Sequence, residues 1–295
     1  MKTMHRMTII LVLLLNMFSL CVGAESSSIS YLGPEGTYTE EASQLFFGME
    51  NAFYPQKTVA DAVQMMLRSE TEFAVIPQEN TIGGPVYNYV DELLAHDGIS
   101  IVGEVELPIR QALLVKEGTA LADIVVVYSH AQGITQGAAW LKEYLPQAEV
   151  IEVSSTAEGA RMVSEAAENN CAAIASTGAA KVYGIRVLAE NIQQNEDNVT
   201  RFYALSKAAP DTATSDRMVF TATGDASALT RLLQVMADSG IELVSLHDRP
   251  QMTVLGSYVY LIECANAGYA AFEQLAGIEG FTYQYYGAFP VKFDD

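Results

Sequence analysis

The stretch FAVIPQENTIGGPV, residues 73–86, decides the fold of this chain. Its first five residues form an unbroken apolar run, which is typical of a strand in a parallel sheet that is buried on both faces. The residues that follow, 78–86, are polar and rich in glycine, which predicts a turn directly after the strand. In open α/β sheets, ligands bind beyond the carboxyl ends of the strands, so this turn is a first candidate for a site.

Strand and helix patterns alternate on both sides of this stretch. Before it, a strand at 29–33 leads through the loop GPEGTYT (33–39) into a helix capped by Thr39, and a strand at 52–55 precedes a helix capped by Thr58. After it, a second set of units is expected, with strands at 123–130, 149–153 and 171–176 and helices at 134–145, 154–169 and 177–184. This order predicts a doubly wound α/β fold.

Two such sets predict two lobes with a cleft between them, in the manner of periplasmic binding proteins. The first lobe is expected at about 29–104 plus 190–207, and the second at about 105–189. Extended crossings near 101–110 and 187–202 would join them.

A third unit follows the two lobes. The polar linker 207–216 ends the first domain, which spans 25–207. Beyond it, 217–295 contains the order βαββαβ, which predicts a small ferredoxin-like domain.

Residues 1–24 have the pattern of a cleavable secretory signal peptide. Lys2 and Arg6 precede an apolar run at 9–20, and small residues at 22–24 suit a cleavage site. The apolar run is too short to span a bilayer comfortably. We therefore expect a periplasmic or secreted protein without membrane contact after cleavage; lipidation at Cys21 and an uncleaved anchor are the alternatives.

The chain is strongly acidic. Its formal net charge is −20, and without residues 1–24 it has 14 basic and 36 acidic residues, a net charge of −22. This charge argues against nucleic acid and anionic membranes as partners, and an anionic substrate would need local donors. The two remaining cysteines, Cys171 and Cys264, fall in different predicted domains, so we expect buried free thiols rather than a disulfide framework.

Polar loops with hydroxyl or amide groups recur at the ends of successive strands. They contain Thr37, then Glu79, Asn80 and Thr81, then Ser129 and His130 with Gln132 and Gln136, then Ser154, Ser155 and Thr156, then Ser176 and Thr177, and finally Thr200 and Arg201. Many neutral donors with few charges suit a small polyoxygenated acid. Helix caps, a strand-end histidine and a loop carboxylate are the ordinary structural interpretations. The sequence contains no evident metal set, nucleotide fingerprint or serine-hydrolase elbow.

The stretch NVTRF, Asn198–Phe202, opens the last apolar run of the first domain. The hydroxyl of Thr200 can donate or accept a proton, and the guanidinium of Arg201 is a permanent cation that matches a carboxylate bidentately. A hydroxyl beside a guanidinium at a strand edge suits a small acid that must lose an oxygen. A polar strand end with a surface arginine is the alternative.

The blocks GPEGTYT, PQENTIGGPV, YSHAQGITQ, CAAIAS…AAKVYGIRVL and NVTRF, in this order and spacing, resemble the prephenate dehydratase family. The resemblance covers nearly all of the chain after the signal peptide, and the last domain resembles the regulatory ACT domain of those enzymes. It implies that prephenate loses carbon dioxide and its ring hydroxyl to give phenylpyruvate, in phenylalanine biosynthesis. It also implies that no cofactor or metal is used and that the chain forms a homodimer or homotetramer.

The resemblance assigns roles to residues. Thr200 would donate a proton or a hydrogen bond to the leaving hydroxyl, and Arg201 would hold a substrate carboxylate or anchor its loop. Asn80, Thr81 and Gln136 match positions that line the family's pocket. We also expect substrate contacts from Thr37, Glu79, Ser129, Ser155, Thr156 and Phe202.

Some residues depart from the family's pattern. Ala131 and Gly137 stand where Pro and Cys are common, without loss of a reacting group. In the ACT-like domain, the usual phenylalanine-sensing motifs are altered, so phenylalanine inhibition is open. Its candidate site residues are Ala228, Leu229, Asp248, Arg249 and Pro250.

Two other functions remain at this point. The glycines after ENT resemble plant-type arogenate dehydratases, which would make phenylalanine directly from arogenate. A non-catalytic periplasmic solute-binding protein would also have two lobes, a cleft and a signal peptide, but the ACT-like domain and the five ordered blocks argue against it.

Overall fold

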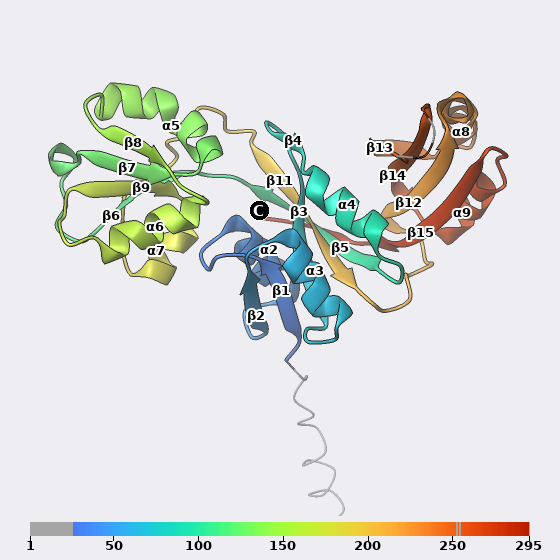
Figure 1. The fold of residues 1–295 in the computed structure, drawn as a ribbon, viewed down its shortest axis with the longest axis horizontal. Coiled ribbons are helices and arrows are strands. Elements are labelled where there is room, and N and C mark those ends of the chain that lie inside the picture. The colour runs from blue at the N-terminus through green and yellow to red at the C-terminus, as the bar shows by residue number, and fades with distance from the viewer. Residues whose placement is uncertain (1–25, 252, 254, 295) are drawn as a thin grey trace, which may run out of the picture.

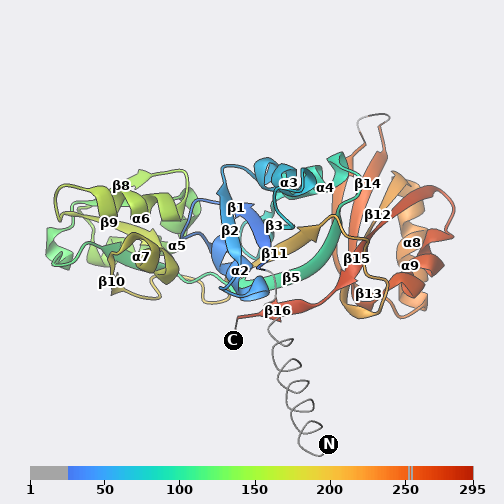
Figure 2. The ribbon, with the colours of Figure 1, turned by 90° about the horizontal axis from the view of Figure 1, so that it is seen from below.

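The computed structural model describes residues 26–251, 253 and 255–294, so the predicted signal peptide, 1–24, lies outside the described residues. Three units lie in a row (Figures 1 and 2), with lobe two at one end, lobe one in the middle and the C-terminal domain at the other end. The predicted two-lobed α/β fold with a ferredoxin-like third unit is confirmed. None of the helices within the described residues has the length and apolar character needed to cross a membrane.

Lobe one contains a seven-stranded sheet in the order β16-β5-β11-β3-β1-β2, with β4 paired to β3. Its strands are β1 (Ser28–Leu32), β2 (Ala52–Gln56), β3 (Phe73–Asn80), β4 (Gly84–Pro85), β5 (Ser100–Pro108), β11 (Val199–Ser206) and β16 (Val291–Phe293). Its helices are α2 (Tyr38–Phe47), α3 (Val59–Leu67) and α4 (Tyr87–Ala95). Strand β11 runs antiparallel to both β3 and β5 because the chain enters it on its return from lobe two.

Lobe two contains a five-stranded sheet in the order β10-β6-β9-β7-β8. Its strands are β6 (Ala112–Val115), β7 (Val126–Ser129), β8 (Glu149–Glu152), β9 (Cys171–Ala175) and β10 (Arg186–Ala189). Its helices are α5 (Ala131–Tyr144), α6 (Thr156–Glu165) and α7 (Thr177–Tyr183), with a 3₁₀ turn η2 (Leu121–Asp123). Two links, 109–111 and 190–198, join this lobe to lobe one.

The C-terminal domain has the predicted βαββαβ order and an antiparallel sheet in the order β13-β14-β12-β15. Its elements are β12 (Ser215–Asp225), α8 (Ala226–Asp238), β13 (Glu242–Pro250), β14 (Ser257–Ala267), α9 (Tyr269–Ala276) and β15 (Phe281–Phe289). Cys264 on β14 and Cys171 on β9 are both free and buried, as predicted.

Two domain boundaries differ from those predicted. Strand β5 pairs with β11 along its whole length to Pro108, so lobe two begins after 108 and not at 105. The last residues do not belong to the C-terminal domain, because β16 pairs in parallel with β5 of lobe one, Val291 opposite Glu104. Main-chain hydrogen bonding across the sheet, which the local pattern does not report, sets both boundaries.

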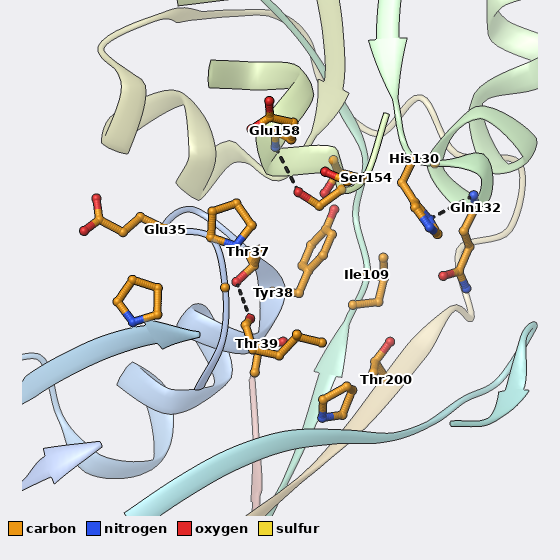
Figure 3. A pocket seen from close by; sticks show the side chains of 18 of the residues that line it. Glu35, Thr37, Tyr38, Thr39, Ile109, His130, Gln132, Ser154, Glu158 and Thr200 are labelled. Atoms are coloured by element: carbon orange, nitrogen blue, oxygen red, sulfur yellow. Dashed lines mark hydrogen bonds between the residues drawn. The ribbon is translucent and has the colours of Figure 1, made fainter. Parts of the chain in front are cut away.

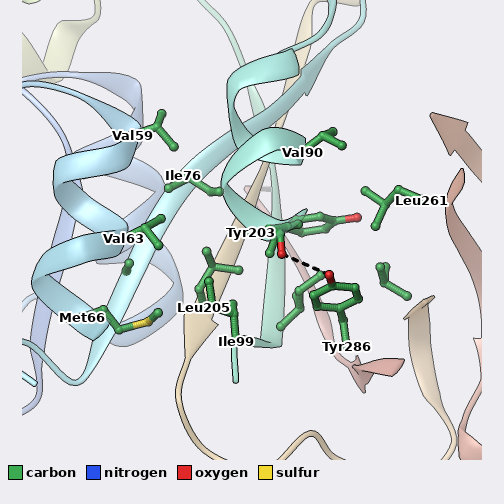
Figure 4. Packing of buried hydrophobic residues seen from close by; sticks show 14 of the residues in the cluster. Val59, Val63, Met66, Ile76, Val90, Ile99, Tyr203, Leu205, Leu261 and Tyr286 are labelled. Carbon is green, nitrogen blue, oxygen red and sulfur yellow. Dashed lines mark hydrogen bonds between the residues drawn. The ribbon is translucent and has the colours of Figure 1, made fainter. Parts of the chain in front are cut away.

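The C-terminal domain and lobe one share one hydrophobic core (Figure 4). Tyr203 and Leu205 of β11 pack in the same cluster as Leu261 of β14 and Tyr286 of β15. The hydroxyl of Tyr286 also donates to the backbone oxygen of Leu93 on α4 at 3.1 Å. Because this core is continuous, the position of the C-terminal sheet is tied to that of the strands that carry NVTRF.

Two local predictions are wrong in ways that affect the site. The strand predicted at 73–77 continues to Asn80, since Glu79 and Asn80 pair with Arg201 and Thr200 of β11. The cap of α2 is Thr37 and not Thr39, because the Thr37 hydroxyl accepts the Glu40 backbone N–H. Thr58, Ser155 and Ser176 cap their helices as predicted.

Candidate active site

A cavity of about 990 Å³ lies between the two lobes. Lobe one contributes the loop after β1 and the ends of β3 and β11, and lobe two contributes the starts of α5 and α6 (Figure 3). The predicted residues that line it are Thr37, Asn80, His130, Gln132, Gln136, Ser154, Ser155, Thr156, Thr200 and Phe202. The structure therefore brings most of the strand-end polar residues to one place.

The loop after β1 closes one side of the cavity by touching lobe two. Gly36 has φ +80°, and a Cβ there would lie 3.1 Å from the Cα of Ala179, so a side chain would be strained and crowded. The Ser176 hydroxyl donates to the Gly36 backbone oxygen at 3.3 Å, and the Tyr183 hydroxyl donates to that of Glu35 at 2.8 Å. These contacts hold the two lobes together beside the cavity.

Asn80 and Thr200 form a directed hydrogen bond on the cavity wall. Asn80 Nδ2 donates to Thr200 Oγ1 at 2.9 Å, and only 9% of Thr200 is exposed. Asn80 Oδ1 accepts from the backbone N–H of Gly83 at 2.8 Å and from Gln132 Nε2 at 2.9 Å. These donors fix the amide, so the Thr200 oxygen is the acceptor of this bond and its own proton is available to a group in the cavity.

A β-bulge next to the site aims these side chains. In the pairing of β3 with β11, Thr200 lies opposite Asn80 and Phe202 lies opposite Pro77, which leaves one extra residue, Gln78, on β3. The extra residue turns both Gln78 and Glu79 away from the cavity while Asn80 faces it. Bulges are common beside active sites because they re-aim a side chain in this way.

A pair of glutamines carries unpaired groups in the cavity wall. Gln111 Nε2 donates to Gln136 Oε1 at 2.8 Å, and the two residues are 2% and 5% exposed. Among the described residues, neither Gln136 Nε2 nor Gln111 Oε1 has a hydrogen-bond partner. A buried unpaired donor and acceptor are costly, so they are suited to a ligand that supplies both partners.

Arg201 does not face the cavity, so the prediction that it holds a substrate carboxylate there is wrong. Since side chains alternate along a strand, its guanidinium lies on the opposite face from Thr200. Its Nε and Nη2 each donate to a Glu104 oxygen at 2.8 Å, Nη1 lies 3.4 Å from Glu79, and Nη2 also contacts Glu263 of the C-terminal domain. The other prediction for Arg201, an anchoring role, fits this geometry.

Two of the three carboxylates around Arg201, those of Glu104 and Glu263, are buried, whereas that of Glu79 is partly exposed. Glu104 is fully buried, and this burial, with the nearby Glu263, raises its pKa to about 8 although Arg201 acts in the opposite direction. Glu79 is engaged by Arg201, so its predicted contact with a substrate in the cavity is also wrong.

Two further predicted contacts serve the structure of the walls. The Ser129 hydroxyl is fully buried and donates to the backbone oxygen of Ile174 at 2.7 Å. The Thr81 hydroxyl accepts the backbone N–H of Val199 at 3.0 Å and donates to the backbone oxygen of Asp197. Neither residue lines the cavity, so the structure does not bring these two predicted contacts to the site.

Charged groups on the cavity wall lie apart from Thr200. Figure 3 shows Glu35 and Glu158 on the side opposite Thr200. Arg161 also lines the cavity, but it donates to Glu158 and Glu165 and holds the pKa of Glu158 below its usual value. Lys57 is a lining cation that forms no ion pair with a described residue. Within the described residues, no group of three or more potential metal-ligating side chains is gathered.

The candidate regulatory residues lie in the C-terminal domain. Ala228 is buried on α8, and Leu229 packs against the core of this domain. Arg249 donates to both carboxylate oxygens of Asp91 on α4, at 2.7 and 2.9 Å, and lies over the Tyr87 ring. The neighbouring Asp248 and Pro250 are exposed on β13.

Gln111 and Lys57 line the cavity but were not predicted from the sequence. Gln111 is the better placed of the two by its contacts. It lies in the short link between β5 and β6, and its position there is fixed by its backbone N–H, which donates to Gln193 of the other link at 2.9 Å. The polar pair Arg110 and Gln111, directly before the apolar run of β6, was the available signal, but the sequence does not show that the two links meet.

Taken together, a cleft between two α/β lobes and a hydroxyl oriented by amides define a class of enzyme. Such an enzyme would use neutral donors at its reacting centre, and this one carries a further small domain packed against the lobe with the hydroxyl.

The chain belongs to the prephenate dehydratase family, whose model matches residues 29–210. It is 36% identical over 246 residues to the bifunctional chorismate mutase/prephenate dehydratase of Neisseria gonorrhoeae, covering 82% of this chain and 68% of that one. The prephenate dehydratase of Arthrobacter aurescens, solved in complex with L-Phe, is 28% identical with a TM-score of 0.77, covering 88% of this chain and 89% of that one. GqqA, described as a novel type of quorum quenching acylase, has a TM-score of 0.81 at 23% identity, covering 90% and 98%, which shows a shared fold alone.

Proposed function

We propose that this chain converts prephenate to phenylpyruvate, water and carbon dioxide in the cavity between its lobes, as a hydro-lyase of phenylalanine biosynthesis. The hydrogen bond from Asn80 to Thr200 is the observation that carries the proposal. It leaves the Thr200 hydroxyl as a donor toward the cavity, where the ring hydroxyl of prephenate must depart.

Loss of carbon dioxide and hydroxide together creates an aromatic ring, so the driving force lies in the substrate. The barrier comes from the poor leaving group, which needs a hydrogen bond or a proton as its bond to carbon breaks. A threonine hydroxyl is a weak acid, and the chain of donors from Gln132 through Asn80 to Thr200 would stabilise the developing charge on the departing oxygen. The apolar side chains of Ile109, Pro77 and Phe202 would pack against the ring.

The distribution of charge supports this assignment. A carboxylate that leaves as carbon dioxide loses its charge, so a cation bound to it would stabilise the ground state more than the transition state. The residues around Thr200 are neutral, and Arg201 is turned away. Lys57 and the unpaired Nε2 of Gln136 are the donors that we assign to the side-chain carboxylate and keto group, which remain in the product.

An assay on the purified chain tests this function. Prephenate at neutral pH should yield phenylpyruvate, read by its absorbance in alkali, with arogenate as a parallel substrate and Thr200→Val as the matched inactive control. Consumption of neither compound would reject the proposal, and a preference for arogenate would change the substrate but not the reaction.

We also propose that the protein is exported and that residues 1–24 are removed. The basic start, the apolar run and the small residues at 22–24 support this. In cells that express the chain, the mature protein should begin at Glu25 and occur outside the cytoplasm. An intact N-terminus in the cytoplasmic fraction would contradict it.

Phenylalanine binding and a homodimeric or homotetrameric state remain predictions for this chain. The Arthrobacter aurescens relative was solved with L-Phe, which supports the first. Calorimetry with L-Phe, and light scattering with and without it, would test both; an absence of binding heat would show that the altered motifs have lost the effector.

A further inference from the structure

The face of β3 and β11 that points away from the cavity is bound by one carboxylate of the C-terminal domain, Glu263 of β14. Glu263 is 1% exposed and uses both of its oxygens. Oε1 contacts Arg201 and lies 3.2 Å from Arg217 Nε. Oε2 accepts three hydrogen bonds, from the Tyr203 hydroxyl at 3.0 Å, Ser245 Oγ at 3.1 Å and Gln78 Nε2 at 3.3 Å.

These contacts reach both strands that carry the reacting pair. Gln78 is the bulged residue two positions before Asn80 on β3, and Arg201 directly follows Thr200 on β11. Gln78 Nε2 also donates to the Tyr203 hydroxyl at 2.9 Å, which links the two strands behind the site. A single side chain from another domain thus joins β3 and β11 within two residues of Asn80 and Thr200.

We propose that Glu263 is a positioning residue for the dehydration, which holds β3 and β11 so that Asn80 can direct the Thr200 hydroxyl into the cavity. This inference rests on the proposed function. It acts through the backbone of two strands, since Glu263 lies on the opposite side of the sheet from the cavity. Misplacement of a reacting group by 1 Å can cost about 10²-fold in rate, so a small shift of either strand is enough to be measured.

Glu263→Gln in the full chain is the test, because glutamine keeps the size and one oxygen acceptor but removes the charge. Glu106→Gln is the matched control, since Glu106 belongs to the same group of charges, 3.3 Å from Arg217, and within the described residues no hydrogen bond or ion pair joins its side chain to β3 or β11. We expect Glu263→Gln to lower kcat about tenfold or more, with KM within about threefold, and Glu106→Gln to leave both near their original values.

A double-mutant cycle distinguishes positioning from a general loss of structure. If Glu263 acts through Thr200, then Glu263→Gln has no further effect on kcat in a Thr200→Val background. A general structural role lowers kcat by the same factor in both backgrounds, and that result would overturn the proposal. If Glu263→Gln does not fold, Tyr203→Phe, which removes one hydrogen bond to Glu263, replaces it in the same cycle with a smaller expected effect.

Amide hydrogen exchange supplies a readout that needs no activity. Peptides that cover 78–84 and 198–204 should exchange faster in Glu263→Gln than in Glu106→Gln. If the original chain does not turn over prephenate, the proposed function fails, but this comparison still decides the role of Glu263. Equal exchange in the two variants would show that Glu263 does not hold the two strands.

Discussion

Replacing Thr200 with valine removes the proposed donor and almost nothing else. Valine has nearly the same shape, and the residue is buried in the wall, so packing is retained. Asn80 Nδ2 loses one acceptor but keeps Asn198 Oδ1 at 2.7 Å and the Val199 backbone oxygen at 3.2 Å. With these partners in place, the cost in the free energy of unfolding should be about 1 kcal/mol, which a domain of ordinary stability tolerates.

The effect on turnover should be much larger. A positioned proton or hydrogen-bond donor contributes about 10²–10⁴-fold to a rate, which corresponds to about 2.7–5.4 kcal/mol of activation free energy. We therefore expect kcat with prephenate to fall by about this factor in Thr200→Val, while the thermal midpoint changes little. Thr200→Ser keeps the hydroxyl, so it should retain kcat within about tenfold.

Steady-state formation of phenylpyruvate, with thermal unfolding of the same samples, measures both quantities. If Thr200→Val kept more than a tenth of the original kcat, the hydroxyl would not be the group that assists the leaving oxygen. A large loss shared equally by the valine and serine variants would point to packing rather than to the hydroxyl.

Three further predictions concern the walls and the domain contact. Gln136→Leu removes the unpaired Nε2, so KM for prephenate should rise about tenfold with a smaller change in kcat. An unchanged KM in steady-state assays would show that Gln136 does not bind the substrate. Arg201→Lys loses the two-point contact with Glu104, so urea titration should show a loss of about 1–3 kcal/mol in the free energy of unfolding, with KM unchanged. A raised KM with unchanged stability would show instead that the guanidinium binds the substrate. The pKa of Glu104 is about 8 in the folded chain and near 4.5 in the unfolded chain, so the free energy of unfolding should fall as pH rises between these values. Glu104→Gln should therefore flatten the slope of the urea midpoint against pH. An unchanged slope in that variant would assign the pH dependence to another group.

Much of the fold follows from local patterns. The apolar run at 73–77, the capping hydroxyls of Thr58, Ser155 and Ser176, and the order of elements after 216 act within a few residues of each other, so the sequence displays them directly. The Asn80–Thr200 pair is less evident from the sequence, because Asn80 ends β3 whereas Thr200 lies at the start of β11, and only the antiparallel pairing of these strands brings the two together.

The orientation of Arg201 could not be predicted, because it depends on partners far away in the chain. Adjacent residues on a strand face opposite ways, so Thr200 and Arg201 cannot both line the cavity, but the sequence alone does not say which of them does. The choice is made by Glu104 and Glu263, 97 and 62 residues away, which surround the guanidinium. The bulge at Gln78 is hidden for the same reason, since it is a property of the pairing of β3 with β11.

The return of the chain to lobe one as β16 gives the C-terminal domain two attachments, the linker after Ser206 and the residues around Pro290. A unit joined by one tether could swing freely, but this domain is held at two points along β5 and its sheet packs in the core of lobe one. A change in its sheet would therefore act directly on β5, next to the strand that carries Thr200.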